Sequence, residues 1–292
     1  MQQRDTRKGI LLMIATTAVF AAQDALSRHL ADTYSVILVV MLRYWFFALF
    51  VTAVAGRRAG GVRAAARTSR PVLQIGRGIL LAAEICVMVL GFTLLGLTES
   101  HAVFALYPLL VVALSGPVLG EKVGPVRWTA VAIGFVGILV ILQPGGRVVS
   151  PAALIPLLAA AMFALYGLLT RLAAKDDTAE TSFFWTGVAG AAFMTLVGLP
   201  WWETMTPSDY GWMAVLCVTG ATGHWLLIKV YEAAEASAVQ PFSYLQLVFA
   251  SAIGVAVFGE TVRASTALGA AIIVGAGLFA LLRERRRSEA RA

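Results

Sequence analysis

The stretch Ala233–Glu260, AAEASAVQPFSYLQLVFASAIGVAVFGE, decides the fold, because a similar stretch, LTESHAVFALYPLLVVALSGPVLGE, occupies Leu97–Glu121. Each copy has an acidic residue near its start, passes Ala-Val, crosses an apolar span that contains proline and tyrosine, and ends on Gly-Glu. A second internal match aligns Phe20–Arg28 with Phe163–Arg171. Two copies of the same segments predict a duplicated architecture.

The composition indicates an integral membrane protein. The 292 residues are 59% hydrophobic and 13% charged, whereas soluble domains are roughly 45–50% apolar and about 25% charged. A transmembrane helix needs about 20 mostly apolar residues, and these continuous runs do not alternate as barrel strands do. Ten such runs lie between polar or Pro/Gly breaks, at residues 9–31, 34–55, 71–95, 100–119, 125–143, 151–173, 180–202, 208–230, 238–258 and 264–282.

The net charge of +7 is distributed as a topology signal rather than as a nucleic-acid-binding surface. With the N-terminus in the cytoplasm, the outer ends of the spans carry only Arg28, Arg147 and Arg263, so we expect no nucleic-acid partner. Both termini are then cytoplasmic, and the expected location is the bacterial inner (plasma) membrane. The inner ends carry Arg4, Arg7, Lys8, Arg57, Arg58, Arg63, Arg67, Arg70, Lys122, Arg127, Arg171, Lys175, Lys229, Arg283, Arg285, Arg286, Arg287 and Arg291.

Five spans in each half is an odd number, so the second half enters the membrane from the opposite side. The sequence therefore predicts an all-α polytopic membrane protein with ten transmembrane helices, arranged as two inverted five-helix repeats around a central cavity. Residues 1–145 form the first repeat and residues 146–292 the second, within one integrated membrane domain. Small-residue spacings such as Ala130-xxx-Gly134 allow close helix contacts, and we expect a monomer or a weak dimer.

The duplicated stretches also carry a family resemblance. Those that end in Gly120-Glu121 and Gly259-Glu260 each follow an acidic-small-Ala-Val start and precede a helix rich in small residues. This pattern is similar to the signature of the drug/metabolite transporter superfamily, and within it the chain resembles the EamA family of ten-helix carriers over nearly its whole length. The resemblance implies transport of a small-molecule substrate without ATP hydrolysis. Consistently, the chain has no GxxxxGK[ST] loop to hold phosphates, and no cofactor is expected.

The favoured function is a secondary transporter with alternating access that exports amphipathic metabolites such as aromatic and other neutral amino acids. Here the chain resembles the YddG-type exporters of aromatic amino acids. The FSYLQLV run at Phe242–Val248 also resembles carriers of other metabolites, so a vitamin, a nucleoside-like compound or a cationic drug-like compound is an alternative. The rival class, a membrane-embedded enzyme, would need a cluster of acids, histidines or a nucleophile. The nearest candidate for such a cluster is Lys175-Asp176-Asp177, which we interpret as a solvated turn.

Inverted repeats place the substrate near the bilayer midplane, where helices interrupted by proline contribute to the site. Pro108 and Pro241 disturb their helices in this way, and Tyr107 and Tyr244 lie beside them. A kink needed only for packing, and aromatic residues that serve only as core, are the structural alternatives. The expected substrate-binding residues are Tyr107, Tyr244, Gln246, Phe20, Phe104, Phe163, Tyr166 and Ser243.

Charges inside a membrane are costly and rarely persist without a partner or a role. Arg43 and Glu84 fall at similar depth in the second and third spans, so an ion pair is the first hypothesis. Asp24 and Arg28 are one helical turn apart and are expected to satisfy each other. His224 would suit proton coupling by its titration range, although a satisfied core histidine is the alternative. Arg43, Glu84, Asp24 and His224 are therefore the candidates for coupling, and no metal site is expected.

Overall fold

The computed structural model describes residues 6–58, 60–120, 124–142, 151–233 and 240–289, and every regular element in these ranges is helical. The α-helices of the first half are α1 (Thr6–Ala31), α2 (Val36–Gly56), α3 (Gly61–Ala65), α4 (Pro71–Leu95), α5 (Leu97–Phe104), α6 (Tyr107–Leu119) and α7 (Pro125–Leu142). The second half contains α8 (Leu154–Ala173), α9 (Ala179–Gly198), α10 (Pro207–Ala233), α12 (Leu245–Phe258) and α13 (Ala264–Glu289). Three short 3-10 helices are η1 (Pro151–Ala153), η2 (Leu199–Trp201) and η3 (Gln240–Tyr244).

Length and composition make this an all-α membrane protein, as expected. Within the described ranges, six helical segments are long and apolar enough to cross a membrane, at residues 7–31, 36–56, 71–95, 97–119, 151–173 and 179–201. Shorter apolar helical stretches lie at residues 128–141, 242–258 and 264–279. The one-turn helix α3 was not predicted, because five residues that include Gly61 and Arg63 carry no apolar run.

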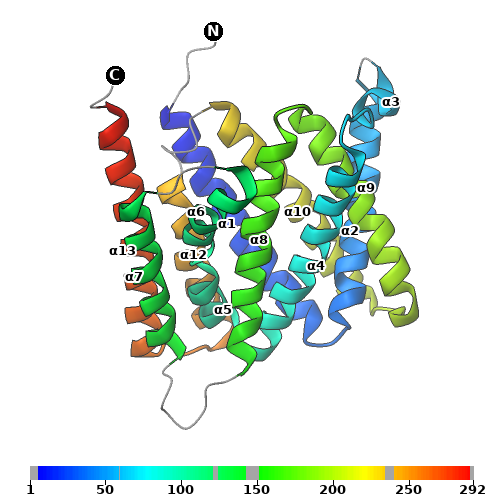
Figure 1. Ribbon diagram of the computed structural model, residues 1–292. Coiled ribbons are helices and arrows are strands. Elements are labelled where there is room, and N and C mark those ends of the chain that lie inside the picture. The colour runs from blue at the N-terminus through cyan, green and yellow to red at the C-terminus, as the bar shows by residue number, and fades with distance from the viewer. Residues whose placement is uncertain (1–5, 59, 121–123, 143–150, 234–239, 290–292) are drawn as a thin grey trace.

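The long helices stand side by side with their axes roughly parallel or antiparallel. The chain therefore crosses repeatedly from one end of the bundle to the other (Figure 1). Both termini lie at the same end, which we call the terminal end; the opposite end is the distal end. Helices α7 and α13 pack together at one edge of the bundle, and α2 and α9 pack together toward the other edge. The remaining helices lie between these two pairs.

The fourth and ninth expected spans are both interrupted, and proline explains why. The fourth span is two helices, since α5 ends at Phe104 and α6 starts at Tyr107 with Pro108 in its first turn. A proline N–H is missing there, and the first turn is where a helix tolerates that loss. The ninth span begins as the 3-10 helix η3, which contains Pro241, and continues as α12. The interruptions at Pro108 and Pro241 confirm the predicted breaks.

Two glycines end these interrupted spans. Gly120 follows α6 with φ of 73°, and Gly259 follows α12 with φ of 64°. Glycine adopts this left-handed conformation without the strain that a Cβ would bring, which is why it commonly terminates helices. The Gly-Glu pair at the end of each repeated stretch therefore marks a helix end, as predicted.

Small residues let the edge pair α7 and α13 approach closely. A Cβ on Gly137 would lie 2.8 Å from the carbonyl oxygen of Gly269, and one on Gly269 would lie 2.5 Å from the carbonyl oxygen of Gly137. Backbones can come this near only where both helices lack side chains, and such contacts drive helix association in membranes. Gly137 and Gly269 thus serve packing within the chain.

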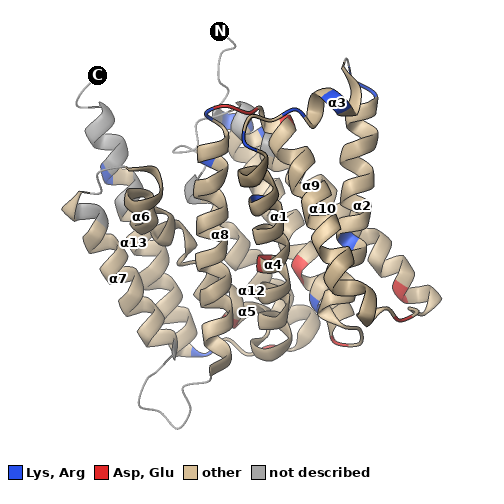
Figure 2. Ribbon diagram, turned by 45° about the vertical axis from the view of Figure 1, so that its right-hand side comes forward, with Lys and Arg blue, Asp and Glu red and all other residues tan. Residues whose placement is uncertain are grey.

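Basic residues gather at the terminal end. Figure 2 shows most of the blue segments at that end, notably around α3 and in the turn that follows α8. Exposed ion pairs hold part of this surface together: Arg58 contacts Glu180, and Arg70 Nε lies 2.6 Å from Asp176 Oδ2. The charge asymmetry expected from the sequence is therefore present between the two ends of the bundle.

Candidate functional site

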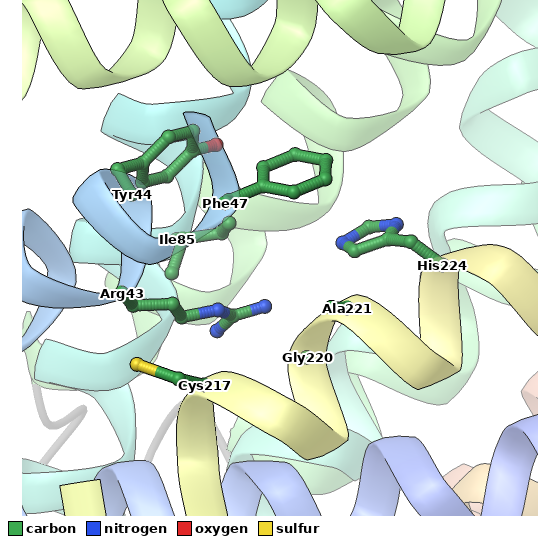
Figure 3. A pocket seen from close by; sticks show the side chains of 8 residues that line it. All are labelled: Arg43, Tyr44, Phe47, Ile85, Cys217, Gly220, Ala221 and His224. Carbon is green, nitrogen blue, oxygen red and sulfur yellow. The ribbon is translucent and has the colours of Figure 1, made fainter. Parts of the chain in front are cut away.

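A small cavity at the centre of the bundle separates α2 from α10. Arg43 from α2 and His224 from α10 project into it from opposite sides, as Figure 3 shows. Its volume is about 10 Å³, which is near the minimum for one water molecule, so the seam is almost closed. The lining residues are Arg43, Tyr44, Phe47, Ile85, Cys217, Gly220, Ala221 and His224.

Aromatic rings surround the His224 imidazole. The Phe47 ring stacks on it with centroids 5.7 Å apart, and the Phe20 ring meets it edge-on at 5.4 Å. Phe20 is thus a neighbour of the α2–α10 seam. The structure places His224 inside the bundle as predicted, but its contacts are apolar rings rather than a charge partner.

Arg43 and Glu84 do not form the expected ion pair. Both residues are more than nine-tenths buried, at 7% and 4% exposure, and Glu84 lies within electrostatic range of Arg43 and of Asp24. Among the residues that the structure describes, however, no ion pair or hydrogen bond joins Arg43 to Glu84. The reason is that Arg43 extends toward α10, where a Cβ on Gly220 would lie 3.2 Å from its Nε atom.

Asp24 is held by three polar side chains from three helices. His101 Nε2 of α5 lies 3.1 Å from Asp24 Oδ2, and Gln246 Nε2 of α12 donates to the same oxygen at 3.0 Å. Gln23 Nε2 lies 3.5 Å from Asp24 Oδ1. The His101 ring also stacks flat on Phe92, with centroids 5.2 Å apart. This junction joins α1, α5 and α12, and His101 was not foreseen as one of its members.

The expected pairing of Asp24 with Arg28 is wrong, because Arg28 binds Glu260 instead. The Glu260 carboxylate also accepts hydrogen bonds from the backbone N–H groups of Leu97 at 2.7 Å and Thr98 at 2.9 Å. These two groups open helix α5, whose first N–H donors have no partner within the helix. Beneath the pair, the Arg28 guanidinium sits 4.0 Å from the centre of the Phe258 ring. Glu260 therefore closes the distal end by joining α1, α5 and the turn after α12.

The environment of Glu260 favours its charged form. Partial burial alone would raise the pKa of the carboxyl, but the nearby Thr98 hydroxyl and the hydrogen bonds from the Thr98 and Leu97 amides, together with the Arg28 charge, lower the pKa below its ordinary value. A helix N-terminus and a cation both stabilise an anion. These contacts give Glu260 a structural role at the start of α5.

Four of the predicted aromatic residues form one continuous group, here called the aromatic group: Phe104, Tyr107, Phe163 and Tyr166. The Phe104 and Phe163 centroids are 5.5 Å apart, Tyr107 meets Phe163 edge-on at 5.1 Å, and Phe163 lies 6.1 Å from Tyr166. The group lines the facing surfaces of α5, α6 and α8. The structure thus brings together residues that the sequence separates by up to 62 positions, as Phe104 and Tyr166 are.

Tyr244 and Ser243 take different positions. Tyr244 is buried and its hydroxyl points to α13, because a Cβ on Gly277 would lie 1.9 Å from that oxygen. It still lies within electrostatic range of Tyr107. Ser243 is half-buried in η3. Gln246 belongs to the Asp24 junction described above rather than to the aromatic group.

Arg77 is a buried cation that the sequence reasoning overlooked. It is only 1% exposed, its Nε donates to Thr170 Oγ1 at 3.0 Å, and its guanidinium lies 5.1 Å from the centre of the Tyr166 ring. Gln74 accepts a further bond from it and donates to Asp177 Oδ2 at 2.7 Å. The signal was available, since Arg77 interrupts the apolar run 71–95.

Asp177 ties the turn after α8 to the start of α4, so it is more than part of a solvated turn. Thr68 Oγ1 donates to Asp177 Oδ2 at 2.5 Å. Partial burial alone would raise the pKa of Asp177, but bonds from Thr68, Gln74 and the Ser69 amide, with the Arg70 charge, lower that pKa. The contact fixes the terminal end of the α4–α8 interface.

A shallow apolar groove lies on the outside of the same α2–α10 seam. Its volume is about 250 Å³, and it shares Ala221 with the central cavity. The lining residues are Phe46, Phe50, Val218, Ala221, Thr222 and Trp225. The α2–α10 seam therefore has a hollow on both its inner and its outer side.

Comparison with known proteins gives consistent results. The model of the EamA-like transporter family matches residues 7–143 and matches again at residues 150–282. An S-adenosylmethionine uptake transporter of Rickettsia prowazekii (strain Madrid E) is 26% identical over 95% of this chain and 94% of its own length. A riboflavin transporter of Rhizobium johnstonii (strain DSM 114642 / LMG 32736 / 3841) is 31% identical over 77% of this chain and 74% of its own length.

A third relative, the pseudopaline exporter CntI of Pseudomonas aeruginosa (strain UCBPP-PA14), is 25% identical over 92% of this chain and 94% of its own length. A solved crystal structure superposes with a TM-score of 0.67 at 20% sequence identity, over 97% of this chain and 100% of that chain. At this identity the superposition shows a shared fold and nothing more.

Proposed function

Because the chain belongs to the EamA-like transporter family, we propose that it is a secondary metabolite carrier with alternating access. The observation that carries the proposal is the double match of the family model over nearly the whole chain, together with relatives of similar length that are named as transporters. A membrane-embedded enzyme is disfavoured by the same names. Transport through the bundle requires that a central site open to one side of the membrane at a time.

We propose that the two halves, residues 1–145 and 146–292, are inverted repeats of five transmembrane helices each. The packing of the helices supports this. The contact between α1 and α10 corresponds to the contact between α8 and α4. In the same way, the contact between α6 and α8 corresponds to the contact between α12 and α1. Three further pairs, α2 with α9, α7 with α13 and α5 with α12, join each helix to its own counterpart. A twofold relation between the halves produces this pattern.

Alternation between two states follows from a difference between two corresponding seams. The α4–α9 seam is tight, since a Cβ on Gly78 would lie 2.8 Å from the Ala189 Cβ and 3.0 Å from the Trp185 carbonyl oxygen. Its counterpart, the α2–α10 seam, holds the central cavity and the outer groove. In the carrier cycle the two seams exchange these roles, which opens the cavity to opposite sides of the membrane.

The substrate is an amphipathic metabolite, and the central charges favour one with an amino-acid head group. Arg43 and Glu84 are buried, of opposite charge and unpaired among the described residues. An uncompensated charge inside a membrane is costly, and a carboxylate at Arg43 with an ammonium at Glu84 would compensate both. The aromatic group would then hold an apolar or aromatic side chain, as expected for aromatic and other neutral amino acids. Riboflavin and S-adenosylmethionine are the alternatives that the relatives' names supply.

Orientation follows from the basic terminal end. We place it, with both termini, in the cytoplasm of a bacterium, because cytoplasmic loops carry an excess of Lys and Arg. The distal end, closed by Glu260 and Arg28, then faces outward in the inner membrane.

The test is counterflow in proteoliposomes. Vesicles loaded with unlabelled compound take up the labelled form transiently if a carrier exchanges it, without any added energy source. The panel contains L-phenylalanine, L-tryptophan, S-adenosylmethionine and riboflavin, and empty liposomes are the control. Exchange of at least one compound supports the proposal. Exchange of riboflavin alone would contradict the proposed amino-acid head group of the substrate. Exchange of none of the compounds would contradict the proposal that the protein is a carrier.

A further inference from the structure

His101 makes two contacts at the Asp24 junction that can both be hydrogen bonds only with an additional proton. His101 Nδ1 lies 3.0 Å from the carbonyl oxygen of Leu97. A carbonyl only accepts, so this contact is a hydrogen bond when Nδ1 carries the hydrogen. In a neutral imidazole the other nitrogen, Nε2, is then an acceptor. That atom faces Asp24 Oδ2 at 3.1 Å, and an ionised carboxylate also only accepts.

Two acceptors at this distance repel each other unless one proton lies between them. It resides on Nε2, which gives an imidazolium beside a carboxylate, or on Asp24, which gives a carboxylic acid beside a neutral imidazole. In either form the pair holds one proton more than a neutral histidine and an ionised aspartate. His101 is 3% exposed, so solvent cannot supply a substitute hydrogen bond.

The surroundings bear on both forms of the pair. Gln246 donates to the same Asp24 oxygen at 3.0 Å and Gln23 lies beside the other oxygen. Glu84 of α4 is within electrostatic range of Asp24. On α1 itself, Arg28 is taken by Glu260, and Arg43 and His224 face the α2–α10 cavity instead.

We propose that Asp24 and His101 form the proton-binding site of the carrier, and that this proton closes the distal end of the bundle. The inference rests on the proposed carrier function. With the proton bound, the Nε2–H–Oδ2 bond joins α1 to α5, and Gln246 joins both to α12. On release, the proton leaves to solvent and the neutral ring has one hydrogen for two acceptors. When that hydrogen stays on Nδ1, bonded to the Leu97 carbonyl, Nε2 and Oδ2 face each other as two acceptors, and α5 and α12 are free to move away from α1.

The direct test detects the proton without transport. The chain has three histidines, so nitrogen NMR of histidine-labelled protein gives few signals, and His101→Gln assigns the relevant one. The proposal is supported if, near neutral pH, NMR shows a doubly protonated His101 ring or infrared spectroscopy shows a protonated Asp24. A singly protonated His101 beside an ionised Asp24 would overturn it.

The functional test is substrate-dependent proton movement into proteoliposomes that contain a pH-sensitive dye, with whichever compound of the panel shows counterflow. In Asp24→Asn the amide N–H donates to a neutral His101, so the junction forms without the extra proton. We expect this variant to lose substrate-dependent proton movement at least tenfold, and to lose it by a larger factor than counterflow. Asp32→Asn, which removes an exposed carboxylate at the end of the same helix, should behave as the wild type.

The outcomes separate the two proposals. Proton movement that survives in Asp24→Asn, or that disappears only in Glu84→Gln, would overturn the assignment while leaving the carrier intact. Absence of counterflow in the wild type would overturn the carrier, and the NMR result would still decide the protonation of the pair. If Asp24→Asn fails to fold, the NMR result on the wild type again decides.

Discussion

Replacing Glu260 by glutamine should weaken the distal end of the bundle by an amount that the contacts allow us to work out. The carboxylate accepts from two backbone N–H groups at 2.7 and 2.9 Å and pairs with Arg28. Hydrogen bonds to a charged group contribute about 1.5–3 kcal/mol, against about 0.5–1.5 kcal/mol for neutral pairs. If each of these three interactions is weakened by about 1 kcal/mol, the free energy of unfolding falls by about 3 kcal/mol.

Two effects adjust this figure. Glutamine has one acceptor oxygen, so one helix N–H would face an NH₂ group, which adds to the loss. The side chains of Arg28 and Glu260 are 16% and 13% exposed, so water partly replaces the ion pair and reduces the loss. We therefore expect Glu260→Gln to lower the free energy of unfolding by about 2–3 kcal/mol.

The assay is reversible unfolding of the purified protein in mixed detergent micelles, followed by tryptophan fluorescence. Glu180→Gln is the matched control, because the side chains of Glu180 and its partner Arg58 are 64% and 51% exposed. Exposed ion pairs of this kind contribute little to stability, within about 0.5 kcal/mol. In a double-mutant cycle, Arg28→Gln should be less costly on the Glu260→Gln background than alone. A Glu260→Gln protein as stable as the Glu180→Gln control would refute the reasoning.

Three further outcomes follow from the same structure. Because the pKa of Glu260 is lowered from its ordinary 4.5, its contribution is complete above that pH and is lost as pH falls through the lower folded-state value. The stability difference between wild type and Glu260→Gln should therefore shrink as pH falls below 4.5. Gly277→Val should destabilise by about 1–3 kcal/mol, because its Cβ would meet the Tyr244 hydroxyl, whereas Gly275→Ala meets nothing within 4 Å and should be neutral in the same unfolding assay. Gly220→Ala would place a methyl 3.2 Å from Arg43 Nε and 3.3 Å from Gln23 Oε1, and should slow counterflow severalfold; an unchanged rate would argue against a central site at Arg43.

Local patterns predicted the helices well, because each depends on a continuous apolar run. The expected span at residues 71–95 and the helix α4 (Pro71–Leu95) have the same bounds. The breaks near Pro108 and Pro241 were also predictable, since proline removes an N–H wherever it falls. What the runs could not give is the start of α5 at Leu97, three residues before the expected span, because its first N–H groups are bound by Glu260 from across the chain.

The polar contacts were harder to predict, because sequence proximity suggests partners that the fold separates. Asp24 and Arg28 are one turn apart on α1, yet each binds residues from other helices: His101 and Gln246 for Asp24, and Glu260 for Arg28. Only the packing of α1 against α5 and α12 reveals these partners. By contrast, four of the aromatic residues expected at the substrate site do lie together, whereas Phe20, which the internal match aligns with Phe163, lies beside His224 instead.

Arg43 illustrates the limit for the candidate site. Its depth in the second span correctly indicated a buried charge, but the direction of its side chain is set by the α2–α10 seam. Gly220 leaves the space that the guanidinium faces, and no local signal in the sequence links residues 43 and 220. The site residues as a set therefore remain a prediction for the transport experiments.

The most direct test of the central claim, a cavity at the α2–α10 seam that opens alternately to each side, is the sided reactivity of Cys217. The chain has two cysteines, so Cys86→Ser leaves Cys217, which lines the cavity, as the single thiol. A membrane-impermeant thiol reagent is applied from either face of sealed, oriented vesicles, with and without the exchanging substrate. If the cavity opens alternately to each side, the substrate should change the two labelling rates in opposite directions. Equal and simultaneous labelling from both faces, or rates that the substrate leaves unchanged, would contradict it.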